Sequence, residues 1–161
     1  MQDDSKTKTP TALARLKRLR VELDGLINGD EYGLFEYNRS TAEIERLTKN
    51  SIKPDERAVL FLHGMESDLK GYRPFIKLLA KRDADLRILG FQYPNDGSLA
   101  RDSKFLIREM KRCETVSDHI DFICHSAGGL VFRHFVEVEQ QGFRRAFFLG
   151  TPHAGSDLAS L

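Results

Sequence analysis

The sequence predicts an α/β protein with a parallel sheet, and three observations lead to this fold class. Short apolar runs typical of strands recur along the chain, amphipathic stretches of helical periodicity separate them, and the two kinds alternate in strict order. Parallel strands need long crossover connections, so this alternation predicts a three-layer structure with helices on both faces of the sheet. The expected strands cover 58–62, 86–93, 120–124 and 146–149, and the expected helices cover 72–82, 98–112 and 127–139.

The first 54 residues lack this alternation, and we expect a helical prefix over 1–54 followed by the α/β domain over 55–161. A helix is expected over 10–27, because a proline suits its first position and leucines recur at helical spacing. Ser40-Thr-Ala-Glu43 has the form of a capping box, which predicts a second helix over 40–49.

Segments of the α/β part carry their own local signals. Ala58 to Leu62 is an unbroken apolar run, which is typical of a strand buried on both faces. Pro74 falls in the first turn of the next expected helix, where its missing N–H is not needed. Leu106 and Met110 lie on one side of the expected helix over 98–112, which makes that side apolar.

Composition and charge argue against several classes of protein. The 161 residues include 25 basic and 24 acidic side chains, and this balance argues against a nucleic-acid-binding arm or a polybasic membrane anchor. The longest apolar run is far too short for a transmembrane segment, and the polar N-terminus has no signal-peptide core. Cys113 and Cys124 lack zinc-ligand spacing, and no phosphate-binding glycine motif occurs. We therefore expect a soluble, cytoplasmic protein with no metal and no cofactor.

The stretch from His119 to Val131 predicts a strand, a sharp turn and a helix, with Ser126 at the turn. Gly128 and Gly129 follow, which matches a nucleophile elbow, in which a serine occupies a strained turn. Small neighbours let the departing helix pass close to the strand, and the helix N-terminus offers free N–H groups to an oxyanion. An ordinary serine that caps a helix is the alternative interpretation, but a plain cap does not need small residues on both sides.

The two residues that precede Ser126, Cys124 and His125, are interpreted separately. Cys124 stands where the elbow pattern has its first glycine, and its small side chain keeps the turn feasible. As a nucleophile, Cys124 would require a small residue at position 122, but Phe122 stands there, so packing in the core is the preferred role. Cys124 and His125 are not expected to form a catalytic dyad, because neighbouring strand side chains point to opposite faces. His125 is instead expected to orient the turn.

Two further motifs follow predicted strands. His63 and Gly64 come directly after the strand over 58–62, where a glycine lets the backbone turn an N–H inward. In elbow enzymes this loop supplies one oxyanion donor and the residue after the nucleophile supplies the other, so the candidates are the N–H groups of Met65 and Ala127. The third motif, Leu149-Gly-Thr-Pro-His-Ala-Gly-Ser156, lies at the sheet edge where ligands bind in open α/β sheets.

Leu62-His-Gly-Met65, Cys124-His-Ser-Ala-Gly-Gly129 and Leu149 to Ser156 together resemble the α/β-hydrolase family, in its lipase and esterase branch, over about residues 57–161. The resemblance implies that Ser126 is the nucleophile of an ester or thioester hydrolase. It also implies that the four strands match the third to sixth strands of the family sheet, in the spatial order 86–93, 58–62, 120–124 and 146–149. The other implied site residues are Met65 and Ala127 in the oxyanion hole, with His63, Gly64, His125, Gly128 and Gly129 in support.

The triad acid and base of the family have no clear counterpart in this chain. The family places the acid after a seventh strand and the base near the C-terminus, and this chain ends after the sixth strand. Thr151 stands where some lipases carry the acid, Asp157 is a nearby alternative, and Asp121 is expected to be structural. The other histidines offer no obvious base; these are His63, His119, His134 and His153.

These observations favour a serine hydrolase that acts on carboxylic ester or lipid acyl bonds, with its base and acid beyond this chain. The alternative is a catalytically incomplete binding or scaffold module derived from the same fold. The expected partner is a small-molecule ester or lipid, and no nucleic acid. The apolar strand over 146–149 would be an uncovered sheet edge, through which we expect the chain to self-associate.

Overall fold

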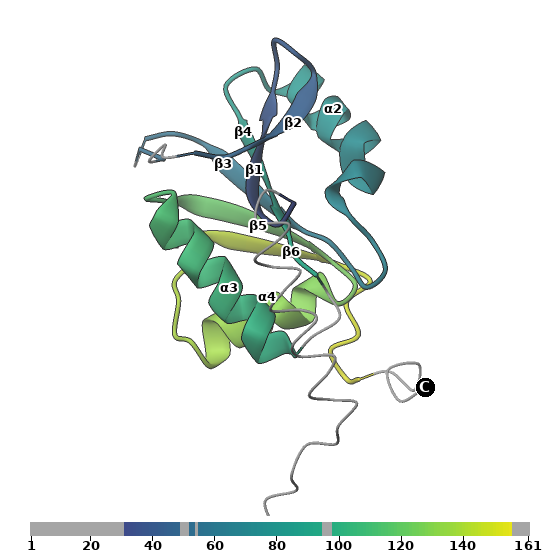
Figure 1. Ribbon diagram of the computed structural model, residues 1–161, viewed down its shortest axis with the longest axis vertical. Helices are drawn as coiled ribbons and strands as arrows, with labels where there is room; N and C mark the ends of the chain where they lie inside the picture. Colours follow the sequence, from purple (N-terminus) through teal and green to yellow (C-terminus); the bar gives the residue numbers. More distant parts are fainter. Residues whose placement is uncertain (1–30, 49–51, 54, 95–97, 156–161) are drawn as a thin grey trace, which may run out of the picture. The chain divides into compact units, whose positions relative to one another are not determined.

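The computed structural model describes residues 31–48, 52–53, 55–94 and 98–155, and a six-stranded mixed sheet is at its centre (Figure 1). The spatial order of the strands is β2-β1-β4-β3-β5-β6. The strands are β1 (Gly33–Asn38), β2 (Glu43–Arg46), β3 (Ala58–Leu62), β4 (Arg87–Gln92), β5 (Ile120–His125) and β6 (Arg145–Leu149). The helices are α2 (Arg73–Arg82), α3 (Leu99–Arg112) and α4 (Gly128–Glu137), with short 3-10 helices η1 (Leu69–Tyr72) and η2 (Ser117–His119).

The parallel part of the sheet agrees with the sequence-based prediction. Strands β4, β3, β5 and β6 are parallel and lie in the expected spatial order. In the register, Leu62 of β3 is opposite Phe91 of β4 and Cys124 of β5. The carboxyl ends of these strands therefore meet at one edge of the sheet, which is where the His63 loop and the Ser126 turn begin.

The two faces of the sheet contribute to two separate clusters of buried side chains. Leu60 and Leu62 of β3 belong to the cluster that includes buried residues of α3 and α4, whereas Val59 and Phe61 belong to the cluster that includes Ile76 of α2. Successive strand residues point to opposite faces, so the unbroken apolar run of β3 supplies both clusters. Helices α3 and α4 cover one face and α2 covers the other (Figure 1), which confirms the three-layer arrangement.

The predicted helix over 40–49 is wrong, and so is the helical character expected for residues 33–46 of the 1–54 prefix. Strands β1 and β2 form an antiparallel hairpin, and β1 pairs antiparallel with β4, so the sheet is mixed rather than wholly parallel. The Asn38 side chain accepts hydrogen bonds from the backbone N–H groups of Ser40 and Thr41, which turns the chain instead of starting a helix. The helix expected over 10–27 lies outside the described residues.

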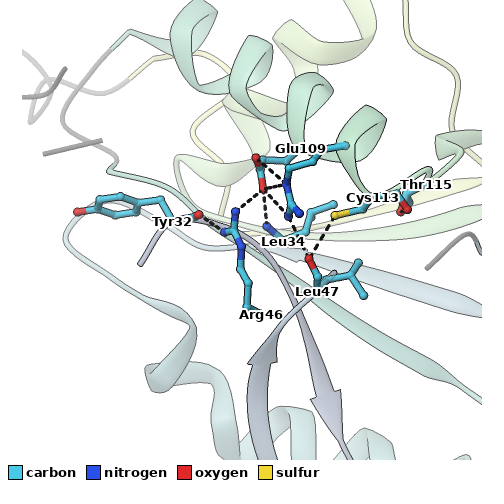
Figure 2. A network of polar contacts seen from close by, with 8 residues as sticks. Tyr32, Leu34, Arg46, Leu47, Glu109, Cys113 and Thr115 are labelled. Carbon is cyan, nitrogen blue, oxygen red and sulfur yellow. Dashed lines mark hydrogen bonds and ion pairs between the residues drawn. The ribbon is translucent and has the colours of Figure 1, made fainter. Parts of the chain in front are cut away.

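Glu109 of α3 connects the hairpin to the helix beside it (Figure 2). Its nearly buried carboxylate accepts hydrogen bonds from the guanidinium groups of Arg46, at 2.8 Å, and Arg112, at 3.0 Å. Arg112 also donates to the backbone oxygen of Leu47, which follows β2. Two guanidinium groups offset the cost of burying the Glu109 charge, and the same contacts fix the hairpin against α3.

Strand β6 is an edge of the sheet within the described residues. Phe147, Phe148 and Leu149 are each 40% exposed or more. An exposed apolar edge strand can template association. The self-association expected through this strand stays a prediction.

Ion pairs join Asp121, near the start of β5, to Arg144 and Arg145, where β6 begins. The Asp121 carboxylate is nearly buried and accepts two hydrogen bonds from Arg144 and two from Arg145. Chiefly because of the bonds from Arg144, the pKa of Asp121 falls to about 2. Asp121 stands near the start of β5, at the opposite end of that strand from Ser126, and this position agrees with the structural role expected for it.

We predict that Asp121→Asn lowers the free energy of unfolding by about 1.5–3 kcal/mol at neutral pH, because charge-assisted hydrogen bonds are lost. The folded pKa lies below the usual Asp value of 3.8, so the carboxylate contributes its full stability above that pH and loses it as pH falls through about 2. Urea unfolding from pH 6 down to pH 2 measures the effect. The exposed Asp55→Asn is the control, and a difference from the unsubstituted protein that stays constant over this pH range would contradict the prediction.

Candidate active site

Ser126 lies in the turn between the last residue of β5 and the first residue of α4, as the elbow pattern predicts. Its φ of 50° is in the left-handed region, which side-chain-bearing residues rarely adopt. The Ser126 N–H donates to the backbone oxygen of Leu149 at 2.9 Å, so the turn is held to the end of β6. Such backbone strain persists when surrounding contacts determine the conformation, and it is concentrated at functional sites.

Gly128 and Gly129 make these contacts possible. A Cβ on Gly128 would lie 2.5 Å from the backbone oxygens of both Leu62 and His63, so the first turn of α4 lies directly against the end of β3. A Cβ on Gly129 would lie 2.1 Å from Oγ1 of Thr151, in the loop after β6. Both positions therefore require glycine, and the small residues of the elbow pattern have a direct steric reason.

The loop after β3 lies against the serine. A Cβ on Gly64 would lie 2.9 Å from the Cβ of Ser126, which shows how closely the Gly64 backbone approaches the turn. His63, before it, is fully buried and stacks on the ring of Tyr93. The Tyr93 N–H donates to Nε2 of His63 at 3.3 Å, and the Tyr93 hydroxyl donates to the His63 backbone oxygen at 2.6 Å.

His63 supports this loop as a neutral side chain. Burial lowers the pKa of His63, which favours the uncharged imidazole. Because Nε2 accepts a hydrogen bond, Nδ1 carries the proton and donates to the backbone oxygen of Gly64 at 2.9 Å. His63 therefore fixes the backbone conformation of the loop and is not placed to act as a base.

The candidate oxyanion donors are two backbone N–H groups. Among the described residues, the backbone N–H groups of Met65 and Ala127 donate to no protein acceptor. Ala127 is the N-cap residue of α4, where the positive end of the helix dipole adds to the attraction for an anion. Two unpaired N–H groups on segments that meet at Ser126 could stabilise a developing negative charge.

No described side chain activates the Ser126 hydroxyl, which has no hydrogen-bond partner within 31–48, 52–53, 55–94 and 98–155. His125 is bonded to Tyr72 and His134 to Ser103, and the His153 ring lies against Phe148. His63 is buried within its loop, and His119 ends η2. Asp157 lies outside the described residues.

Two contributors to the site, Tyr72 and Tyr93, escaped the sequence analysis, and the packing role of Thr151 was not predicted there. Tyr72 bonds His125, Tyr93 holds His63, and Thr151 packs on Gly129 with its Oγ1 buried and unpartnered. Thr151 has a positional signal, since it stands just after β6, in the third motif. The two tyrosines carry no local signal, because each acts on a residue distant in sequence.

Cys124 occupies the core position expected for it. It is fully buried in β5, and burial raises the pKa of its thiol well above the usual value. A thiol that resists ionisation is a poor nucleophile. Its surroundings therefore favour packing over chemistry.

The described residues contain neither a metal-binding cluster nor a membrane-spanning helix. No three His, Cys, Asp or Glu side chains gather there to hold a metal ion. No helix in that part of the chain is long and apolar enough to cross a membrane.

The fold is similar to that of α/β-hydrolase lipases and esterases. The Bacillus licheniformis lipase BlEst2 in its mature form matches 80% of this chain with a TM-score of 0.54 and 16% identity, and this chain covers 50% of that structure. The propeptide form of the same lipase matches 78% of this chain with a TM-score of 0.53 and 15% identity, with 27% of its own length covered. This chain thus spans half of the mature lipase.

The chain belongs to the family described as Domain of unknown function (DUF7379), which matches residues 27–161. No curated protein matches it in sequence. The family match includes the hairpin as well as the elbow, so β1 and β2 lie within the same family domain as the candidate site.

We predict that Gly128→Ala lowers the free energy of unfolding by about 1–3 kcal/mol, because its Cβ would overlap two backbone oxygens that cannot move independently of β3. Gly71→Ala is the matched control, since a Cβ there meets nothing closer than 3.9 Å. Urea unfolding of both variants measures the difference. Equal stability of the two variants would contradict the close approach of α4 to β3.

We predict that both thiols resist alkylation in the folded protein, because Cys113 and Cys124 are buried and burial raises the pKa of each. Iodoacetamide at mildly alkaline pH, followed by mass spectrometry, measures the modification. The same protein in concentrated guanidinium chloride should be alkylated at both positions. Rapid modification of Cys124 in the folded state would show that its thiol is accessible, contrary to a core role.

Proposed function

We propose that this protein is a serine hydrolase that acts on carboxylic ester or lipid acyl bonds, with Ser126 as its nucleophile. The observation that carries the proposal is the positive φ of Ser126 in a strand-to-helix turn, next to segments whose Met65 and Ala127 N–H groups have no protein acceptor among the described residues. A strained serine next to unpaired donors fits acyl transfer, in which a nucleophile and an oxyanion site must adjoin.

In the proposed reaction, Oγ of Ser126 attacks the carbonyl carbon of the ester, and the hydroxyl proton passes to a base. The N–H groups of Met65 and Ala127 donate hydrogen bonds to the resulting oxyanion. Collapse of the tetrahedral intermediate breaks the ester C–O bond, releases the alcohol and leaves an acyl group on Ser126. Water then attacks the acyl-enzyme, which releases the carboxylic acid and restores the serine.

The base and its supporting acid belong to the proposal as well. Because the Ser126 hydroxyl has no hydrogen-bond partner among the described residues, we place the general base and the acid outside them. The lipase that this chain resembles in fold is about twice as long as the matched region, which supports that assignment. The substrate is a small-molecule ester or lipid, and the reaction as proposed uses no cofactor.

The second candidate is a binding or scaffold module that retains the fold without turnover. One observation favours it, namely that the Ser126 hydroxyl lacks an activating partner in the described part of the chain. The steric requirement for glycine at Gly128 and Gly129 does not separate the candidates, since both need the same backbone. An activity measurement separates them.

In the full-length protein, we predict that a fluorophosphonate probe labels Ser126 and that Ser126→Ala abolishes both labelling and hydrolysis of p-nitrophenyl esters. Ser40→Ala, in the exposed hairpin turn, is the matched control and should leave both unchanged. Peptide mass spectrometry locates the label, and a colorimetric assay measures the rate. We expect the 161-residue chain to hydrolyse these esters no faster than its Ser126→Ala variant, because no side chain among the described residues is placed to activate the Ser126 hydroxyl.

Two results would overturn the assignment. Full-length protein that neither reacts with the probe nor hydrolyses esters would favour the scaffold. Loss of activity in Cys124→Ser, together with an active Ser126→Ala, would show that the nucleophile is another residue.

A further inference from the structure

A polar contact between side chains adjoins the proposed nucleophile. Oη of Tyr72 and Nδ1 of His125 lie 2.7 Å apart, within hydrogen-bond distance, and the two rings meet edge to face with centroids 5.8 Å apart. His125 immediately precedes Ser126, and Tyr72 immediately precedes α2. The contact therefore connects the turn to the far end of the loop that follows β3.

This loop, residues 63–72, touches the turn at two points. At its start, a Cβ on Gly64 would lie 2.9 Å from the Cβ of Ser126 and 3.0 Å from Nδ1 of His125. At its end stands the contact between Tyr72 and His125. Met65, whose N–H is a proposed oxyanion donor, lies between these two points in the sequence.

This contact adds little to the stability of the fold. His125 is exposed and Tyr72 is half-buried, and a hydrogen bond open to solvent adds little to the free energy of unfolding. The Tyr72 ring also contacts Phe61 of β3, with centroids 6.1 Å apart, and this packing does not need the hydroxyl. What the hydroxyl adds is a connection between the segments that carry the nucleophile and one oxyanion donor.

We propose that Tyr72 is a positioning residue that acts through His125 to hold the Met65 N–H at the distance from Ser126 that oxyanion binding requires. This inference rests on the proposed function. Both residues act on geometry, and neither transfers a proton or touches the substrate. Small displacements of groups in an active site can cost about a hundredfold in rate, so loss of the contact should lower kcat.

The test compares Tyr72→Phe with the unsubstituted full-length protein in ester hydrolysis. We expect kcat to fall by about tenfold or more, with KM within about twofold and the unfolding temperature unchanged, because donor placement matters most in the transition state. Tyr37→Phe, half-buried on β1, is the matched control and should leave kcat unchanged. A lower unfolding temperature with unchanged kcat would assign the hydroxyl to stability and overturn the proposal.

Variants of His125 test whether Tyr72 acts through it. The amide of His125→Asn can bond the Tyr72 hydroxyl, so this variant should keep kcat within about threefold, whereas His125→Leu should resemble Tyr72→Phe. The double variant Tyr72→Phe with His125→Leu should be no slower than either single variant, because both remove one contact. Additive losses would show that the two residues act separately and would contradict the proposal.

An activity-independent measurement separates this inference from the proposed function. Amide hydrogen exchange across residues 64–69 should be faster in Tyr72→Phe than in the unsubstituted protein, and unchanged in Tyr37→Phe. If Ser126→Ala remains fully active, the proposed function fails. If Ser126→Ala is inactive while Tyr72→Phe keeps its kcat, only the positioning role fails. If the unsubstituted protein and its variants are all inactive, hydrogen exchange alone tests the contact. Faster exchange in Tyr72→Phe would then support the restraint of the loop by Tyr72, and unchanged exchange would overturn it.

Discussion

The close approach of α4 to the end of β3 is the constraint on which the candidate site depends. The backbone at Gly128 lies so near the carbonyl oxygens of Leu62 and His63 that a single added methyl group would lie 2.5 Å from both. Because β5 and α4 must meet in this narrow space, the connecting residue Ser126 takes a positive φ. The same approach places the N-terminus of α4 beside the loop after β3. Both proposed oxyanion donors therefore come from segments that this contact holds together.

Three further contacts hold the His63 loop and the Ser126 turn in place. Tyr93 of the segment after β4 holds His63, and the backbone oxygen of Leu149 at the end of β6 accepts the Ser126 N–H. Tyr72 reaches His125 from the start of α2. Each contact comes from a different segment at the same sheet edge, so the conformation of the turn depends on the parallel register of four strands.

Local sequence patterns correctly predicted those elements for which local residue preferences and tertiary packing favour the same structure. The unbroken apolar run at 58–62 is a strand because both faces of β3 are covered by helices. The strand, turn and helix around Ser126 could be recognised because the backbone approach requires glycine at Gly128 and Gly129, and this need is visible in the residue types. Asp121 could be given a structural role, although its arginine partners became evident only in the structure.

By itself, the sequence determined the parallel core and the serine at the turn, because burial and steric limits act on neighbouring residues. The spatial order of the four parallel strands was implied by the resemblance to α/β-hydrolases. The tertiary structure alone decided the hairpin over 33–46, where a capping-box pattern competed with strand pairing to β4 and with the Glu109 contacts to Arg46 and Arg112. It also decided that Tyr72 meets His125, a contact between residues 53 positions apart. Such pairings depend on how the layers pack, and no local pattern records the partner.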